Sequence, residues 1–200
     1  MRKSTMRLVA ATAAALLAAL PLTGAQAAPK DNTVDAPAAE GAFAFRTANG
    51  ILPTWQRSNL RLSALFPGSS LTNARLTNTT VTLPLVAHLG SANYAAGGFR
   101  ITNDITRDYV TCASPAIDTK AGVVDCVLKD GSNLSMLAIP SIASRRTTTT
   151  WESTTQTFHG IALRVANQRV ADTLNKALKV SVFSPSVTFA TGDLTVTYPS

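Results

Sequence analysis

The stretch YVTCASPAIDTKAGVVDCVL (residues 109–128) decides the fold of this chain. Apolar and β-branched residues flank the turn-forming segment Asp118–Gly122, which predicts two antiparallel strands joined as a hairpin. Cys112 and Cys126 are spaced symmetrically about Thr119, so the hairpin should place them opposite each other on one face. The chain has no other cysteines, and we expect this pair to form a disulfide.

A redox-active pair is the alternative role for the two cysteines. Such pairs are typically spaced Cys-x-x-Cys and lie beside a basic residue that lowers the pKa of one thiol. Neither feature occurs around Cys112 or Cys126. The spacing therefore favours a structural bridge, in a compartment that permits oxidation.

The alternation of apolar and polar residues continues on both sides of the hairpin, with turn residues roughly every ten positions. This pattern predicts an all-β fold, an antiparallel sandwich or barrel. The Thr-rich segment 147–157 should be a strand with threonines on its solvent-exposed face, and the alternative is an O-glycosylated stalk. Gly192-Asp193 should form a turn or bulge. The remaining expected strands are residues 80–89, 99–102, 134–139, 158–163 and 187–198.

One short C-terminal helix interrupts the β pattern. Apolar residues recur at helical spacing between Asn167 and Leu178, which predicts a helix over these residues. Asn167 can cap its first turn. Three turns are marginal in water by themselves, so the apolar face of Val170, Leu174 and Leu178 should pack on the sheet.

The first 27 residues have the layout of a secretory signal peptide. A basic head precedes residues 8–22, which are mostly Ala, Leu, Val and Thr. Ala25 and Ala27 supply the small side chains that precede a cleavage site, so the exported chain should begin at Ala28. We therefore expect a secreted, extracellular protein without a membrane span, whose contacts with the cell surface are non-covalent.

Composition divides the rest of the chain in two. Residues 28–42 are small, polar and Pro-containing, which predicts a flexible N-terminal tail. Residues 43–200 are long enough for a single β-rich domain with a sizeable core.

The charge pattern bears on the partners. The chain carries a formal charge of +7, and three of the positive charges lie in the leader. The remaining Lys and Arg residues are scattered, whereas nucleic-acid binders cluster them on one face, so we expect no nucleic-acid partner. We interpret the scattered basic residues as part of a solvated surface. The alternative is that they weakly attract an anionic cell-wall polymer.

The sequence contains no motif that specifies a reaction, so we expect a protein that is not an enzyme. Its two histidines, His88 and His159, belong to no His-Glu-x-x-His motif, and no Gly-x-Ser-x-Gly motif occurs. His88 and Tyr94 are close in sequence and are the candidate haem ligands, the alternative for His88 being a surface imidazole. Tyr109 and Tyr198 lie in alternating strands, where we expect packed aromatic rings.

Several short motifs recur in an order that matches a known family. They are Val81–Leu85, Gly97–Ile101, Ser114–Asp118, Ala171–Asn175, Phe183, Gly192 and Leu194–Val196. Together they resemble the HtaA domain of secreted actinobacterial proteins, over roughly residues 80–198. The resemblance implies a β-rich surface or secreted domain, and some members of the family bind haem through a Tyr and a His. Residues 43–62 contain no tyrosine and the strand 99–104 after Gly97-Gly98 contains no histidine, so the resemblance assigns no haem ligand here.

These observations favour a secreted, non-catalytic binding or cell-envelope-associated module. Its partner would be a cell-wall polymer, a surface protein or a small ligand, and no cofactor is expected. Haem binding for iron acquisition is the first alternative, and a small secreted hydrolase is the second. A haem protein should have a deep apolar pocket with Tyr or His pointing in, whereas a hydrolase should bring Ser, His and Asp within hydrogen-bond reach.

Overall fold

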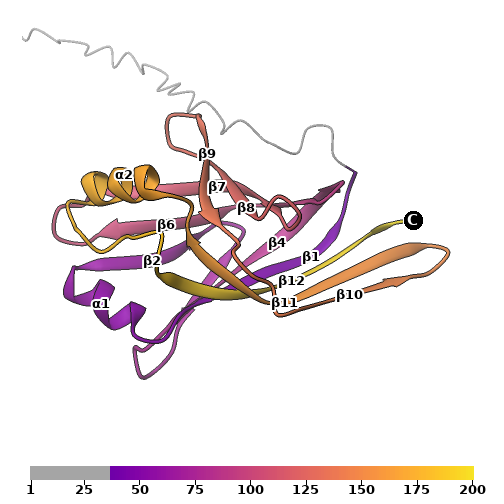
Figure 1. Ribbon diagram of the computed structural model, residues 1–200, viewed down its shortest axis with the longest axis horizontal. Helices are drawn as coiled ribbons and strands as arrows, with labels where there is room; N and C mark the ends of the chain where they lie inside the picture. The colour runs from indigo at the N-terminus through magenta and orange to yellow at the C-terminus, as the bar shows by residue number, and fades with distance from the viewer. Residues whose placement is uncertain (1–36) are drawn as a thin grey trace, which may run out of the picture.

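A computed structural model describes residues 37–200 (Figure 1). The expected leader and most of the expected tail lie outside the described residues. The strands are β1 (Glu40–Thr47), β2 (Leu60–Leu65), β3 (Ser69–Thr72), β4 (Thr79–Leu89), β5 (Ala92–Ala95), β6 (Gly98–Asn103), β7 (Tyr109–Asp118), β8 (Val123–Val127), β9 (Asn133–Ala138), β10 (Ser144–Thr149), β11 (Ser153–Val165) and β12 (Thr188–Pro199). The helices are α1 (Ile51–Arg57) and α2 (Gln168–Leu178).

The strands of the described region form an antiparallel barrel with extensions. Eight of them follow one another as β7, β5, β4, β1, β12, β11, β9 and β8, and pairing of β8 with β7 closes the ring. Outside the ring, β6 pairs with β7, and β2 pairs with the other edge of β6. β3 pairs with β4, and β10 pairs with β11. The all-β prediction is confirmed, and of its two architectures the barrel is the one found.

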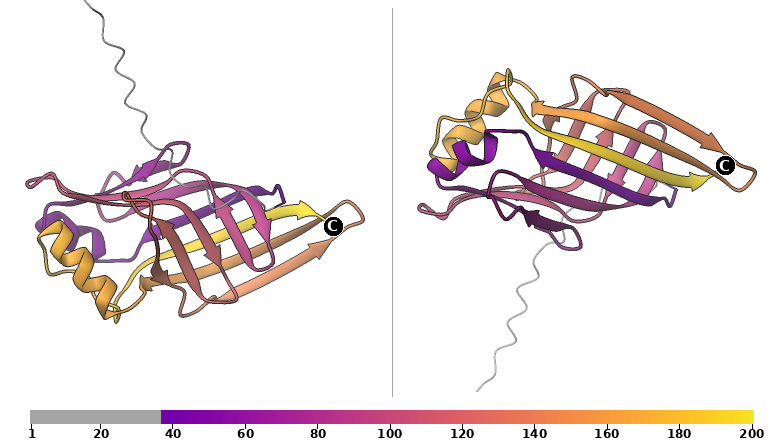
Figure 2. Two further views of the ribbon diagram at one scale, coloured as in Figure 1. Left: turned by 90° about the horizontal axis from the view of Figure 1, so that it is seen from above. Right: turned by 90° about the horizontal axis from the view of Figure 1, so that it is seen from below.

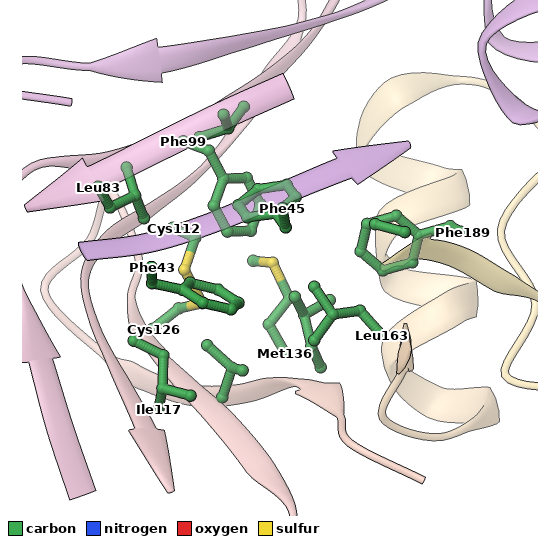
Figure 3. Close-up of a cluster of buried hydrophobic side chains, with 14 of the residues drawn as sticks. Phe43, Phe45, Leu83, Phe99, Cys112, Ile117, Cys126, Met136, Leu163 and Phe189 are labelled. Atoms are coloured by element: carbon green, nitrogen blue, oxygen red, sulfur yellow. A yellow bond between two sulfur atoms is a disulfide. The ribbon is translucent and has the colours of Figure 1, made fainter. Parts of the chain in front are cut away.

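The interior of the barrel is filled by apolar side chains (Figure 3). Phe43 and Phe45 of β1 point inward and are each 1% exposed, because alternate residues of a strand face the same side. The ring of Phe45 meets that of Phe99 edge-on, with centroids 5.4 Å apart. Such aromatic packing contributes about 0.5–1.5 kcal/mol beyond the apolar area that it buries.

The Cys112–Cys126 disulfide is present in this core, with the two Cα atoms 4.7 Å apart. Both cysteines are fully buried (Figure 3). The expected register was wrong, because Asp118 pairs with Val123 and Ala113 with Val127. The turn between the strands is centred beyond Thr119, which displaces the pairing, and the irregularity between Ala113 and Ala116 moves it back by one residue. The resulting Ala113–Val127 pairing places the cysteines diagonally across the hairpin rather than directly opposite.

Helix α2 confirms the predicted C-terminal helix. The side chain of Asn167 accepts a hydrogen bond from the Val170 N–H at 3.0 Å, as an N-cap does. Val170, Leu174 and Leu178 are buried, and the Asn103 side chain donates to the Leu178 carbonyl at 2.8 Å. Both views of Figure 2 place α2 beside α1 at one end of the barrel.

Helix α1 was not predicted. It has only seven residues, including Pro53, so it shows no helical periodicity in the sequence. Trp55 holds it in place: the indole is 2% exposed and lies 5.4 Å from the ring of Phe183 and 6.0 Å from that of Phe189, centroid to centroid. Tertiary packing of one aromatic residue therefore positions a helix that local propensity does not specify.

The N-terminal boundary also differs from the prediction. β1 begins at Glu40, so the last three residues assigned to the flexible tail are part of the sheet. Before them, Ala38 forms a bridge with Ala87 of β4, and Ala39 is buried. Backbone pairing with β4 and β12 orders this segment, although its side chains are small.

The Thr-rich segment is a hairpin and not the single strand that we expected. β10 and β11 are joined through Thr150–Glu152, where the Thr150 hydroxyl donates to the Ser153 carbonyl at 3.1 Å. Such local bonds of threonine favour turns. The hairpin forms an arm at the opposite end from the helices (Figure 2), and Trp151 in its connecting turn is 88% exposed.

β12 runs without a break through Gly192-Asp193, where a turn or bulge was expected. A Cβ atom at Gly192 would lie 2.8 Å from the Ala44 carbonyl oxygen, so glycine permits the close approach of β1. The irregularity lies instead in the facing strand β11, between Phe158 and Ile161. There Gly160 adopts a φ of +63°.

Truncation of Leu178 should separate the buried and the exposed faces of α2. Leu178→Ala removes a fully buried side chain and leaves a cavity, so we expect a loss of about 2–5 kcal/mol in the free energy of unfolding. Asp172→Ala on the exposed face should change it by less than about 0.5 kcal/mol. Chemical denaturation measures both, and equal losses would contradict the docking of α2.

Candidate functional site

A groove opens beside α2 where the barrel wall is incomplete. β7 begins at Tyr109, but its pairing with β8 starts only at Ala113. The space left beside the first residues of β7 is bordered by the connection between β8 and β9 and by α2. It has a volume of about 420 Å³, which is within the usual range for small-molecule sites. We call it the Tyr109 groove.

The inner wall of the Tyr109 groove is apolar. Met136 of β9 and Leu174 of α2 are 1% and 2% exposed, so they belong to the core as well as to the groove. Ala177 on α2 is exposed and leaves room beside it because its side chain is small. The other apolar lining residues are Val110, Leu128 and Leu134. Binding of an apolar group against such a surface is favourable, because it removes apolar area from water.

Two cations lie against the ring of Tyr109, and one of them, Lys129, also lines the groove. The Arg100 guanidinium carbon is 4.6 Å from the centre of the Tyr109 ring, and Lys129 Nζ is 4.8 Å from it. Arg100 comes from the neighbouring strand β6, whereas Lys129 follows β8, so the ring bridges two elements. Cation–π contacts of exposed side chains contribute about 0.5–1 kcal/mol each.

These cations favour ionisation of the phenol. A hydrogen bond from Lys129 and then its charge hold the pKa of Tyr109 below its ordinary value, and the charge of Arg100 acts in the same direction. Asp130 also lines the groove, and a hydrogen bond from the Ser132 hydroxyl lowers the pKa of its carboxyl group. The rim thus combines donors that can receive an acidic group with an apolar interior beneath them.

The structure does not bring His88 and Tyr94 together. In the pairing of β4 with β5, His88 lies opposite Asn93 and Ala87 lies opposite Tyr94. Neighbouring residues of a strand point to opposite faces, so the imidazole and the phenol lie on different sides of the sheet. As a pair they cannot ligate one iron in this arrangement.

His88 is buried and already has partners. It is 7% exposed, its Nδ1 is 2.9 Å from Asn93 Oδ1, and its ring stacks on Tyr198 with centroids 3.8 Å apart. The Tyr198 hydroxyl accepts a hydrogen bond from the Gln156 amide at 2.9 Å. These contacts inside one end of the barrel give His88 a structural role, because a buried polar group is normally paired.

His159 lies on the outer face of the barrel and not in a cavity. Its Nδ1 is 3.2 Å from Asp193 Oδ1, and both side chains are about 60% exposed. Ser144 is the residue opposite His159 on β10. No hydrogen bond joins the Ser144 hydroxyl to the imidazole within residues 37–200, so the three side chains do not form the linked arrangement that a Ser–His–Asp hydrolase needs.

Among residues 37–200, no three His, Cys, Asp or Glu side chains gather closely enough to hold a metal ion. No helix in this part of the chain combines the length and the apolar character needed to cross a bilayer.

Sequence reasoning missed the Tyr109 groove. It identified Tyr109 only as a packed ring, because the strand pattern does not show where β8 ends relative to β7. The feature of the sequence that could have indicated the groove is the pair Lys129-Asp130, two charged residues in the turn after an apolar strand.

Comparisons with known proteins identify a fold likeness only. No family model and no curated protein matches the sequence. Among solved structures, the C-terminal domain of HtaA from Corynebacterium glutamicum is similar, with a TM-score of 0.42 and 8% sequence identity. The match covers 80% of this chain and 98% of that one. At this level the likeness is limited to the general course of the chain, and we transfer no residue role from it.

The ionisation of Tyr109 can be followed by NMR titration with labelled tyrosine, since the chain has only three tyrosines. Tyr109 should lose its proton at a lower pH than an ordinary tyrosine, whose pKa is about 10. Lys129→Met should raise the pKa of Tyr109, because it removes both the hydrogen bond and the charge. Lys120→Met, a matched loss of charge in the β7–β8 turn, should leave it unchanged. An equal response to both substitutions would contradict the contact.

Proposed function

We propose that this protein is a secreted, non-catalytic binding module that holds a small amphipathic acid in the Tyr109 groove. The observation that carries the proposal is the combination of an apolar groove of about 420 Å³ with the exposed ammonium group of Lys129 at its rim. The apolar part of the ligand would lie against the partly exposed Leu128 and Leu134, and its acidic group would meet Lys129.

Lys129 supports an acidic ligand. Its side chain is exposed and lines the groove, so its ammonium group is accessible to a carboxylate or a similar anion. The Arg100 charge, 4.6 Å from the centre of the Tyr109 ring, adds to the positive potential beside the groove.

Export is supported by the leader-like residues 1–27 and by the buried disulfide. Disulfides persist in oxidising compartments outside the cytosol. Association with the cell envelope would follow from contacts with a cell-wall polymer or a surface protein, and it does not depend on the groove.

Haem is the second candidate ligand, and one observation favours it. Tyr109 lies at the rim of an apolar groove and has a lowered pKa, and a phenolate is a ligand of ferric haem in some proteins. Haem is also an amphipathic acid, so the two candidates share the groove and differ in whether Tyr109 binds iron.

Calorimetric titration with dodecanoate tests the proposal. Ala177→Phe places a large ring in the groove without replacing a buried residue, and it should weaken binding tenfold or more. Asp172→Phe, which adds the same ring to the exposed face of α2, should not. Lys129→Gln should weaken the binding of dodecanoate but not of dodecanol, whereas Lys120→Gln should affect neither.

Haemin, titrated in parallel, separates the two candidates. A sharp Soret shift that Tyr109→Phe removes and Tyr94→Phe preserves would make haem the ligand. Binding of dodecanoate that Ala177→Phe leaves intact would contradict the assignment of the groove.

A further inference from the structure

A strip of hydroxyl groups runs along the outer face of β10, β11 and β12. Phe158, Leu194 and Val196 are buried and point into the barrel, so the residues between them point outward. Residues that lie side by side on the three strands form rows across the sheet. One row consists of Thr148, Thr155 and Thr197, and the next consists of Arg146, Thr157 and Thr195. The strip consists of Thr148, Thr155, Thr197, Thr157, Thr195 and Arg146.

The hydroxyl strip leads into a hollow of about 320 Å³ on the same side of the sheet. The hollow lies where β11 is irregular at Gly160, whose N–H donates to Asp193 Oδ1 at 3.0 Å. Arg46, Thr80 and Thr191 also line it. A guanidinium, a carboxylate and two hydroxyls therefore converge in one depression, and they offer both donors and acceptors.

The charged side chains that line the hollow are balanced. They are Arg46 and Asp193, which have opposite signs. A surface without excess charge does not select an anion or a cation. Its chemistry is complementary to a ligand that has many hydroxyl groups and no net charge.

We propose that the hollow and the hydroxyl strip bind an extended neutral polysaccharide. One sugar unit would lie in the hollow, with its hydroxyls bonded to Asp193 and Arg46, and further units would follow the threonine rows toward the tip of the arm. There the exposed indole of Trp151 offers an apolar face against which the C–H groups of a sugar ring can pack. This site is separate from the Tyr109 groove and does not depend on it.

The test is an NMR titration of the labelled protein with neutral hexasaccharides of glucose, mannose and N-acetylglucosamine, and with an acidic hexasaccharide of galacturonate. At least one neutral oligosaccharide should bind more tightly than the acidic one and shift the amide signals of Gly160 and Thr191. Asp193→Asn and Thr191→Val should each weaken that binding tenfold or more. Both replacements are close in shape to the original residue, so the strand pairing should persist.

Two controls separate this site from general effects. Asp172→Asn, a matched change on α2, should leave saccharide binding unchanged. Trp151→Ala should weaken binding of the hexasaccharide but not of the disaccharide, because only the longer chain reaches the tip of the arm. Tighter binding of the galacturonate hexamer, equal binding by all variants, or no shift with any neutral sugar would overturn the proposal.

Discussion

Pairing of β8 with β7 is the constraint on which the rest of this structure depends. Without it the strands would form an open curved sheet, and with it they form a closed ring. We call this β7–β8 pairing the seam. The Cys112–Cys126 bridge joins its two strands inside the core, where both cysteines are fully buried. A bridge that closes a loop of about fifteen residues stabilises a fold by roughly 3 kcal/mol through the entropy of the unfolded chain.

The seam also explains the position of the candidate ligand site. β7 has partners on both edges from Ala113 onward, whereas its first residues pair only with β6 on one side. The unpaired edge leaves the Tyr109 groove, and α2 forms its other wall because the helix docks across that end of the barrel. Fixing the seam therefore fixes the distance between Tyr109 and Lys129, which lie on opposite sides of it.

The two proposed sites use different faces of one scaffold. The groove lies beside the helices and is apolar within, whereas the outer face of β11 and β12 is hydroxyl-rich and contains a hollow whose charges are balanced. A rigid barrel can carry both, since outward side chains of a strand vary without disturbing the inward ones. A protein that held a small ligand at one site and a cell-surface polymer at the other would retain that ligand near the cell.

The sequence predicted the elements whose signals are local. Alternation predicted most of the strands from β4 onward, and the spacing of apolar residues after the Asn167 cap predicted α2, because both patterns are periodic and require no knowledge of partners. The short strands β2, β3 and β5 were not predicted. Helix α1 was missed since it depends on the packing of Trp55, and the Thr-rich hairpin since its turn contains neither Gly nor Pro. The pairing beside the cysteines is displaced by two residues from the expected one, because the turn is centred beyond Thr119. The groove depends on where β8 stops relative to β7, and no single segment encodes that.

Amide hydrogen exchange tests the central role of the seam most directly. The Cys112→Ala/Cys126→Ala double variant should exchange much faster than the oxidised protein in β8, β9 and the second half of β7, which pairs with β8. The amides of β1, β4 and β12, which pair with one another on the far side of the ring, should retain their protection. Acceleration spread evenly over all strands, or unchanged protection in β8, would contradict the account.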